Sequence, residues 1–293
     1  MNTWSTGPSG RVVVITGGTR GLGLALAANL GRAGAMIVIG SRDPEGVRGA
    51  VRRLKDQGTR VEGLPCDVTR LGDAQALAQL AVNAFGSLDL WINNAGLSAP
   101  YGPTLSIPPD EFTRAVATNV FGVYHGSLVA LRVMLPQGSG RLVNILGRGD
   151  RRPAPLQNAY GASKAWVRMF TLALAREYRG QGVSIAAINP GLVRTDLLLR
   201  PSVIEGFEAR VQPLSRVISL WGQDADAAAK RVSSVLAAEG LRNGREWHAL
   251  TPPRLLLGLV REGWRAALGH PTPPTPLDVR SVAPDWRADG PEG

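Results

Sequence analysis

The feature that most constrains this chain is a repeated alternation of short apolar runs with segments of helical length. Residues 12–15 form a β-branched run that ends in glycines, and an Ala- and Leu-rich segment follows at residues 22–32. The same alternation continues to about residue 188. Strands that are apolar along their whole length are typical of parallel sheets buried on both faces. The pattern therefore predicts an α/β fold with a doubly wound parallel sheet.

The elements expected from this alternation fill one domain. Strands are expected at residues 12–15, 36–39, 61–64, 88–92, 141–145 and 184–188, with a last strand at 245–250, and helices at 22–32, 47–57, 74–85, 110–135, 158–178 and 224–239. Such spacing fits a single Rossmann-type sheet. We expect an N-terminal arm at residues 1–10, the domain at 11–250, and a C-terminal helix and Pro-rich tail at 251–293, which from His270 onward is disordered or draped on the surface.

Composition narrows the classes of partner and compartment. The 33 basic and 23 acidic residues give a net charge of +10, which favours anionic ligands, but the arginines are scattered in short pieces and no nucleic-acid partner is expected. The single cysteine, Cys66, excludes an intramolecular disulfide and fits a reducing compartment, so the cytoplasm is expected. The sequence has no export signal and no run of about 18 apolar residues. His125, His248 and His270 lack ligand spacing, so no metal site is expected.

A glycine-rich turn joins the first strand to the first helix. It reads Thr16-Gly17-Gly18-Thr19-Arg20-Gly21-Leu22-Gly23. Glycines at this point let the backbone approach a pyrophosphate, whose charge the helix N-terminus stabilises. Its place in the first strand–turn–helix unit makes this a candidate dinucleotide site.

The end of the second strand indicates which dinucleotide binds. NAD is usually held by an acidic residue at that position, whereas here Ser41-Arg42-Asp43 places a guanidinium before the acid. Arg42, with Arg20 from the glycine turn, could hold a 2′-phosphate. NADP(H) is therefore favoured, while Asp43 leaves NAD(H) open and ordinary solvated arginines are the alternative.

Tyr160 and Lys164 are four residues apart on an expected helix, so they share a face. A phenol with an ordinary pKa near 10 is a poor base at neutral pH, and a nearby ammonium favours its ionised form. The pair is common by chance. Its significance depends on the other motifs around it.

Those motifs resemble the short-chain dehydrogenase/reductase family over about residues 11–195. The residues that match in order and spacing are Thr16 to Gly23, Asp67-Val68, Asn93-Asn94-Ala95-Gly96, Asn119, Tyr160 with Lys164, and Pro190-Gly191. The resemblance implies that Tyr160 exchanges a proton with a carbonyl or hydroxyl oxygen while a hydride passes to or from nicotinamide. It also implies that Lys164 binds the nicotinamide ribose and lowers the pKa of the tyrosine. Ser41-Arg42 resembles the NADP-preferring members.

The same resemblance implies roles for further residues. Asn119 would hold a water in the proton relay, or else be a structural asparagine that kinks its helix; Asp67 would contact adenine, or else cap a helix. Thr195 would contact the nicotinamide carboxamide or a phosphate. The implied cofactor-binding residues are Gly17, Thr19, Arg20, Gly21, Leu22, Gly23, Ser41, Arg42, Asp67, Val68, Asn94, Ala95, Gly96, Tyr160, Lys164, Pro190, Gly191, Val193 and Thr195, and the catalytic ones are Tyr160, Lys164 and Asn119.

One position departs from the family pattern. The family usually has a serine about 13 residues before the tyrosine, where it hydrogen-bonds the substrate oxygen, but this chain has Gly147 there, flanked by Leu146 and Arg148. A backbone N–H, a water or Arg148 could supply the missing hydrogen bond. The substrate could instead carry its own activating group, or the protein could bind the nucleotide as a sensor or partner-binding module with little or no turnover. Because Tyr160 and Lys164 are both retained, an enzyme is favoured.

The remaining segments bear on substrate and assembly. Residues 98–109 and 197–223 fall where such folds place substrate loops, and their apolar side chains indicate a hydrophobic or bulky substrate or ordinary packing. The expected reaction acts on a small, hydrophobic substrate. Residues 252–268 form an amphipathic pattern that could dock on the core, cover the substrate mouth or another subunit, or rest on an anionic membrane. Docking on the core is favoured, so no membrane partner is expected. The family resemblance suggests that the helix carrying Tyr160 helps to form a homodimer or homotetramer.

Overall fold

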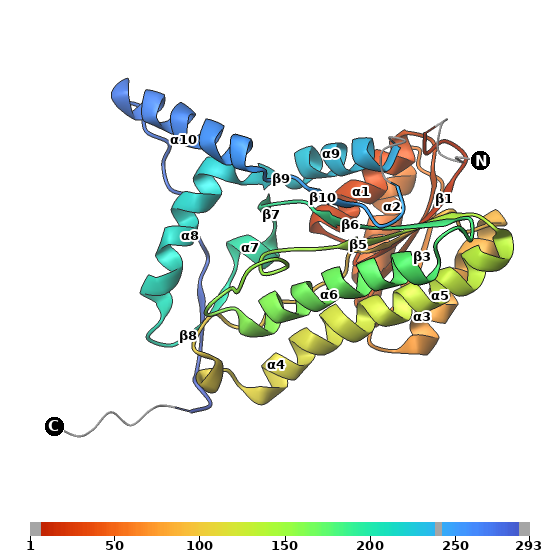
Figure 1. Cartoon of the computed structure of the whole chain (residues 1–293), viewed down its shortest axis with the longest axis horizontal. Helices are drawn as coiled ribbons and strands as arrows, with labels where there is room; N and C mark the ends of the chain where they lie inside the picture. Colours follow the sequence, from red (N-terminus) through yellow and green to blue (C-terminus); the bar gives the residue numbers. More distant parts are fainter. Residues whose placement is uncertain (1–6, 238–241, 287–293) are drawn as a thin grey trace.

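A seven-stranded sheet forms the centre of the molecule (Figure 1). The computed structural model describes residues 7–237 and 242–286. The strand order is β10-β6-β5-β4-β1-β2-β3, and every neighbouring pair is parallel. The strands are β1 (Val12–Thr16), β2 (Met36–Ser41), β3 (Val61–Pro65), β4 (Leu90–Asn93), β5 (Gly140–Ile145), β6 (Val183–Asn189) and β10 (Glu246–His248). The predicted doubly wound fold, including the last strand, is confirmed.

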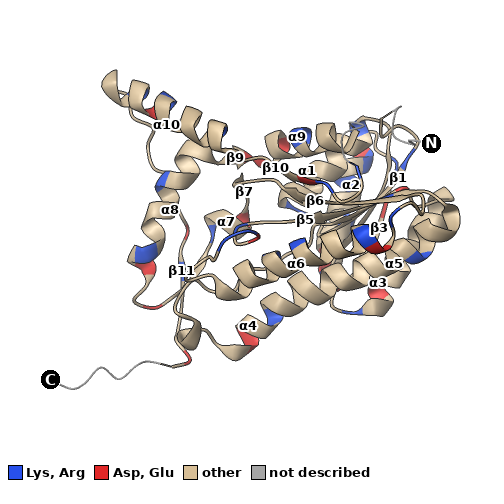
Figure 2. Ribbon diagram, viewed as in Figure 1, with Lys and Arg blue, Asp and Glu red and all other residues tan. Residues whose placement is uncertain are grey.

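Helices cover both faces of this sheet (Figure 1). One face carries α1 (Gly21–Arg32), α2 (Pro44–Asp56) and α9 (Ala225–Ala237). The other carries α3 (Leu71–Phe85), α5 (Gly122–Gln137) and α6 (Asn158–Glu177). Basic and acidic residues are spread over the helices of both layers (Figure 2). Because all seven strands run parallel, their carboxyl ends lie at one edge of the sheet, where a ligand can reach the loops.

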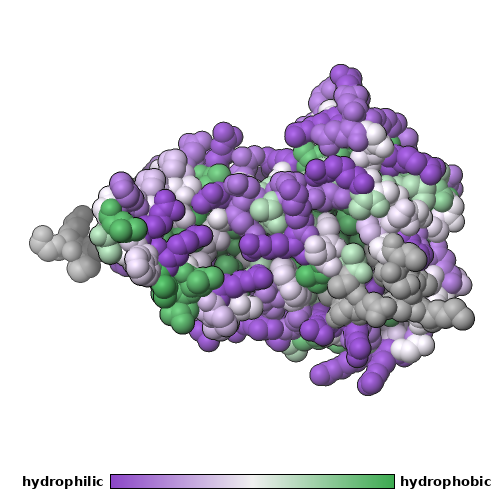
Figure 3. Space-filling model, turned by 90° about the horizontal axis from the view of Figure 1, so that it is seen from above, coloured by the Kyte–Doolittle hydropathy of each residue, from purple (hydrophilic) through white to green (hydrophobic). Residues whose placement is uncertain are grey.

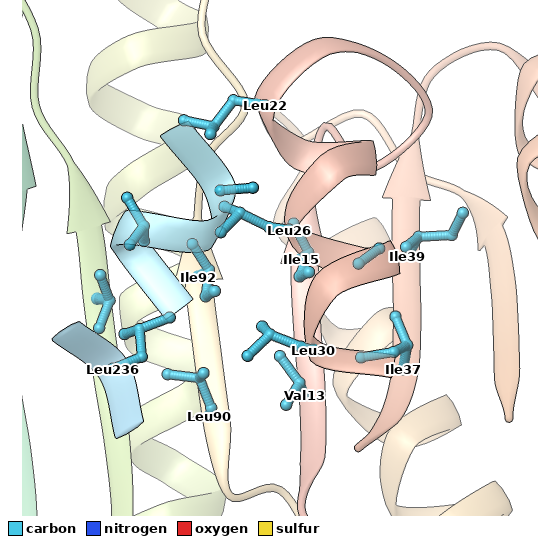
Figure 4. Packing of buried hydrophobic residues seen from close by; sticks show 14 of the residues in the cluster. Val13, Ile15, Leu22, Leu26, Leu30, Ile37, Ile39, Leu90, Ile92 and Leu236 are labelled. Carbon is cyan, nitrogen blue, oxygen red and sulfur yellow. The ribbon is translucent and has the colours of Figure 1, made fainter. Parts of the chain in front are cut away.

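Strand β1 explains why the sheet is buried on both sides. Its residues alternate, so that Val13 and Ile15 belong to the core under α1 and α9, while Val12 and Val14 belong to the core under α3 and α5. In the first of these cores, Leu26 and Leu30 of α1 lie against the strands (Figure 4). Each such side chain, when fully buried, contributes about 1.5–3 kcal/mol to folding.

The helix expected at residues 110–135 is interrupted, so that prediction was wrong in part. The structure has α4 (Pro109–Val116), a π-helical segment (Ala117–Phe121) and then α5. In a π-helical segment the hydrogen bonds reach one residue further along the chain, which rotates the side chains that follow. Asn119 lies at the middle of this segment.

In its described part, the chain beyond β6 adds short strands and three helices outside the central sheet besides α9. It forms β7 (Val193–Arg194), α7 (Asp196–Leu199), β8 (Ser202–Ile204), α8 (Glu208–Trp221) and β9 (Gln223–Asp224), and after β10 it continues through α10 (Pro252–Ala267) to β11 (Arg280–Val282). Strand β11 pairs with β8, so the tail is draped on the body as far as residue 286. The remainder of the tail and most of the N-terminal arm lie outside the described residues. Within the described part of the chain, no helix is long and apolar enough to cross a membrane.

Candidate active site

The glycine turn after β1 is tightly built. Gly17 and Gly21 have φ values of +66° and +54°, which favour glycine. A Cβ on Gly23 would overlap the carbonyl oxygen of Gly17 and lie 2.6 Å from Asn94 Nδ2. The turn therefore leaves the N-terminus of α1 open to an anionic ligand, as a pyrophosphate requires. The other turn residues lie in the same loop, with Thr19 half-buried, Arg20 exposed and Leu22 buried in the core.

The loop after β4 is tied to this turn. Asn94 donates from Nδ2 to the carbonyl oxygens of Thr16 (2.9 Å) and Gly17 (3.2 Å). The backbone N–H groups of Asn94 and Ala95 both donate to Thr16 Oγ1 at 3.1 Å. Gly96 comes next, and a Cβ there would lie 3.7 Å from Lys164 Nζ. The loop thus connects the glycine turn with the Tyr160 region.

At the end of β2, the acid and the guanidinium are in different situations. Asp43 is the N-cap of α2, and its Oδ1 accepts from the backbone N–H of Glu45 at 3.1 Å. Arg42 is exposed and makes no hydrogen bond or ion pair with the described residues. Ser41 is half-buried at the strand end. Arg20, across the turn, lies 3.6 Å from Asp196 at an exposed position. The free guanidinium at this strand end is that of Arg42.

Asp67 and Val68 follow β3. The Oδ1 atom of Asp67 accepts from the backbone N–H (3.0 Å) and the hydroxyl (2.8 Å) of Thr69. It closes a turn ahead of α3, whose own N-cap is Arg70. Val68 is buried, and its carbonyl is 3.0 Å from His125 Nδ1. Asp67 therefore does not cap α3, and the helix-cap alternative for it is wrong.

The segment after β6 returns to the glycine turn. Gly191 has a φ of +79°, and its N–H donates to Asn189 Oδ1 at 3.0 Å. Gln223 donates to the carbonyl of Pro190 at 2.7 Å. Val193 is in the core beneath α1, and a Cβ on Gly21 would lie 3.0 Å from the Thr195 methyl group. The structure therefore brings this predicted segment next to the glycine turn.

Tyr160 and Lys164 lie together on α6. Lys164 is buried, donates to the carbonyl of Ile145 at 3.0 Å, and has its Nζ 5.6 Å from the centroid of the Tyr160 ring. Burial lowers the pKa of Lys164 to about 8, while the charge of Asp150 opposes this shift. The pKa of Tyr160 is raised, first by burial and then by the charges of Tyr101 and Asp150. In the protein alone, loss of solvent dominates the pKa of Tyr160, and the lowering by Lys164 that the resemblance implies stays a prediction.

The side chain of Asn119 is fully engaged. Its Nδ2 donates to the carbonyl of Leu97 (2.8 Å) and to Ser163 Oγ (2.9 Å), and its Oδ1 accepts from the N–H of Leu97 (2.9 Å). Ser163 in turn donates to the carbonyl of Tyr160 at 2.7 Å. Asn119 thus joins the loop after β4 to α6 from within the π-helical segment. This geometry matches the structural alternative for its side chain.

The space next to Gly147 is occupied by the side chain of Tyr160. A Cβ at this position would overlap the Tyr160 hydroxyl and lie 3.0 Å from the Cζ atom that carries it. Gly147 has no positive φ, so its backbone alone does not require glycine. The tyrosine hydroxyl therefore lies in the space where a residue at 147 would begin its side chain.

Sequence reasoning missed a polar cluster next to this position. Asp150 Oδ2 accepts from Asn189 Nδ2 and lies 3.0 Å from both this nitrogen and His248 Nε2. Asn189 also donates to the carbonyl of Gly147 at 3.2 Å. Burial raises the pKa of Asp150, but the hydrogen bonds and charges from His248, Asn189 and Arg151 outweigh it, and the net pKa is lowered. The cluster fixes the segment from Gly147 to Asp150 against β6 and β10.

A hollow of about 680 Å³ lies beside this segment. It is lined by Thr104, by residues 149–156, and by α6 residues that include Gly161, Ala162 and Ala165. Neither Tyr160 nor Lys164 belongs to its lining. The hollow therefore lies between the segment after Gly147 and α6, and the Tyr160–Lys164 pair does not line it.

Comparisons with known proteins identify the family. The family model described as short chain dehydrogenase matches residues 11–201. The chain belongs to this family. The predicted resemblance is therefore confirmed.

Individual relatives are reductases and dehydrogenases by name. The chain is 33% identical over 269 residues, 85% of its length, to a probable chlorophyll(ide) b reductase of Oryza sativa subsp. japonica, described as chloroplastic, of which it covers 52%. It thus spans about half the length of that relative. A 3-ketoacyl-(acyl-carrier-protein) reductase from Brucella melitensis, complexed with NADH, superposes with a TM-score of 0.72 at 26% identity, over 83% of this chain and 97% of that one. A variant actinorhodin polyketide ketoreductase with NADPH gives 0.72 and 26%, over 82% of this chain and 95% of that one. Solved relatives have thus been determined with NADH and with NADPH.

Proposed function

We propose that this protein transfers a hydride between NADP(H) and a carbonyl or matching alcohol of a small, hydrophobic substrate, with Tyr160 as proton donor or acceptor. The observation that carries the proposal is the Tyr160 hydroxyl, held beside Gly147 next to the buried Lys164. Because its pKa is raised, the phenol is protonated at neutral pH and suited to donate a proton. This favours the direction of carbonyl reduction.

The chain's own residues have distinct parts in this reaction. A bound nicotinamide supplies the hydride to the carbonyl carbon, or accepts it in reverse. Tyr160 gives its hydroxyl proton to the carbonyl oxygen, and Lys164, cationic below about pH 8, stabilises the resulting phenolate and would bind the nicotinamide ribose. Asn119 positions the loop after β4 against α6. Gly17, Gly21 and Gly23 leave room for the pyrophosphate.

Support for NADP(H) over NAD(H) comes from the end of β2. Arg42 is exposed with no partner among the described residues, and it can give a 2′-phosphate charge-assisted hydrogen bonds. Asp43 already accepts through Oδ1 as the cap of α2, which leaves one carboxylate oxygen for the role that NAD needs. NAD(H) remains the lesser alternative, since related structures include an NADH complex.

The hydrogen bond that the missing serine would give needs another source. We assign it to Arg148 or Tyr101, which the electrostatics link to the site. The charge of Arg148 lowers the pKa of Tyr101, although burial raises that pKa to about 12 overall, and Tyr101 in turn acts on Tyr160. Both Tyr101→Phe and Arg148→Ala should slow turnover without weakening NADPH binding if they polarise the substrate oxygen.

A hydrophobic substrate is inferred from the apolar surroundings of Tyr101, which is itself only 8% exposed. Its buried cluster includes Val203 of β8 and Val211 of α8, with Phe207 and Val279 packed against it. The rice relative carries chlorophyll(ide) b in its name, which agrees with an apolar substrate. Exposed apolar side chains on α5 and α6, such as Tyr124, Trp166 and Met169, support a homodimer or homotetramer. The single buried cysteine supports the cytoplasm.

The test is NADPH consumption with a panel of aldehydes, ketones and quinones, for the wild type and Tyr160→Phe. We expect wild-type turnover to fall by about 10²- to 10⁴-fold in the variant, because a positioned proton donor contributes that much. NADPH affinity, measured by fluorescence titration, should be unchanged. The lack of a serine at Gly147 also supports a second candidate function, that of a nucleotide sensor or partner-binding homologue. NADPH binding without Tyr160-dependent turnover on any substrate of the panel would favour this second function.

A further inference from the structure

The helix α10 is attached to the body through polar contacts. Glu262 pairs with Arg216 at 3.0 Å and accepts from the backbone N–H of Thr272 at 3.1 Å. Trp221 of α8 donates its Nε1–H to the carbonyl of Leu255 at 3.2 Å. Gly258 is buried at this contact, where a Cβ would overlap the Trp221 indole. The side of α10 that faces the protein is therefore its small and polar side.

The opposite side of α10 carries an apolar stripe, which consists of Leu256, Leu257, Val260, Trp264 and Leu268. These residues recur at helical spacing, so they share one face. All are exposed, with Trp264 68% and Leu257 67% accessible. A helix on the surface of a globular protein normally turns such a face inward. The arrangement is the reverse of the core docking that the sequence favours.

Basic residues border this stripe. Arg254, Arg261 and Arg265 are seven and four residues apart, so they follow one edge of the helix. All three are exposed, and the acid of the helix, Glu262, is paired with Arg216 on the docked side. Arg254 also donates to the carbonyl of Ala249 at 2.8 Å and Arg261 to that of Leu220 at 3.3 Å, so these two guanidinium groups lie where the stripe meets the body. The apolar stripe is thus bordered along one edge by solvent-accessible positive charge.

We propose that α10 binds the surface of a membrane that contains anionic lipids, with the apolar stripe inserted among the headgroups. An interfacial helix needs an apolar face, here of leucine, valine and tryptophan, and basic residues at the border of that face. The arginine stems can lie along the apolar layer while their guanidinium groups reach lipid phosphates. The helix projects at the outer edge of the molecule, away from the sheet (Figure 1), and apolar residues are seen at this end from above (Figure 3).

The charge pattern favours a lipid surface over a second copy of the chain. If two α10 helices paired antiparallel through their stripes, the arginine edge of one would meet the arginine edge of the other, and like charges repel. An anionic surface attracts the same edge. A lipid surface also needs no shape complementarity to a linear stripe.

The test is flotation of the full-length protein with vesicles of phosphatidylcholine, with or without phosphatidylglycerol. We expect binding to the mixed vesicles that is at least about tenfold stronger than to phosphatidylcholine alone, because several arginines each contribute about fivefold near an anionic surface. Leu257→Glu with Trp264→Glu should reduce binding at least about tenfold by removing the inserted groups. Arg265→Gln should reduce it about fivefold and weaken its dependence on salt.

Leu105→Glu is the matched control, since Leu105 is 71% exposed on a different surface, and its binding should equal that of the wild type. Equal thermal stability of the variants excludes a folding defect. The proposal is overturned if the wild type stays with neither type of vesicle, or if Leu105→Glu loses binding as strongly as the stripe variant. If the wild type does not bind vesicles and the stripe variant has half the molecular mass of the wild type in solution, the stripe instead binds a second copy of the chain.

Discussion

Gly23 and Gly147 both follow parallel strands, and a Cβ at either would overlap an oxygen atom, but the neighbours differ in kind. At Gly23 the obstacle is the backbone carbonyl of Gly17, which the strand–turn–helix unit holds in place. At Gly147 it is the hydroxyl of the Tyr160 side chain. The nucleotide side of the molecule is thus determined by its backbone, whereas the substrate side is determined by where one side chain lies.

The nucleotide side should show the largest single effect. Gly23→Ala places a methyl group against backbone that cannot move without opening the glycine turn. We expect NADPH affinity, measured by fluorescence titration, to fall by more than about a hundredfold, equivalent to roughly 2.7 kcal/mol. Gly72→Ala, which meets no atom within 4 Å, is the control and should bind as the wild type does. Unchanged NADPH affinity in Gly23→Ala would show that the backbone contact at Gly23 does not limit nucleotide binding.

Arg42→Ala sharpens the nucleotide side further. Loss of its charge-assisted hydrogen bonds to a 2′-phosphate should weaken NADPH by about 10- to 100-fold, since such bonds contribute about 1.5–3 kcal/mol. NADH has no 2′-phosphate, so its affinity should change little. Titration of both nucleotides with wild type and variant measures this. An equal loss for NADH and NADPH would show that Arg42 does not distinguish them.

On the substrate side, the rate should depend on pH through Lys164. Its pKa is lowered to about 8, so the ammonium is present below this pH and is lost above it. The rate of carbonyl reduction should be level below about pH 8 and fall about tenfold per unit above it. The free energy of unfolding changes in the opposite direction. Lys164 has a pKa of 10.5 in the unfolded chain and about 8 in the folded one, so the folded state loses stability as the pH falls from 10.5 to about 8.

The control for that prediction is Lys164→Met. It should abolish turnover without lowering the thermal unfolding midpoint at neutral pH, because it removes a buried charge. A rate that stays level well above pH 8 would mean that the ammonium is not needed.

Asp150→Asn should have the smallest effect. It weakens the hydrogen bonds with Asn189 and His248 that hold the segment beside Gly147, and should lower stability by about 1 kcal/mol. Because the Asp150 pKa is lowered in the folded state, this stabilisation is present at neutral pH and lost as the pH falls through the acid range. Chemical unfolding of both proteins at neutral and acidic pH measures it. A difference between the proteins that grows as the pH falls would contradict it.

The elements that depend on local sequence could be predicted, whereas those that depend on tertiary contacts could not. The strands, the glycine turn and the shared face of Tyr160 and Lys164 depend on local pattern, so they were predicted correctly. The π-helical segment was not, because Asn119 is held there by Leu97 and Ser163, which only the tertiary fold brings near. The Asp150–His248 contact joins residues 98 positions apart. Spacing rules gave His248 no partner, and no local signal could have found one.

The central claim is that the site works with glycine at 147 because the Tyr160 hydroxyl uses that space. The most direct measurement is the steady-state rate of NADPH-dependent reduction by Gly147→Ser, beside Gly147→Ala and the wild type, with NADPH affinity measured in parallel. We predict that both variants retain NADPH affinity and lose at least about tenfold in kcat, because a displacement of the proton donor by an ångström is enough for such a loss. A rate that rises in Gly147→Ser but not in Gly147→Ala would show instead that the site lacks a serine hydroxyl, and would contradict the account.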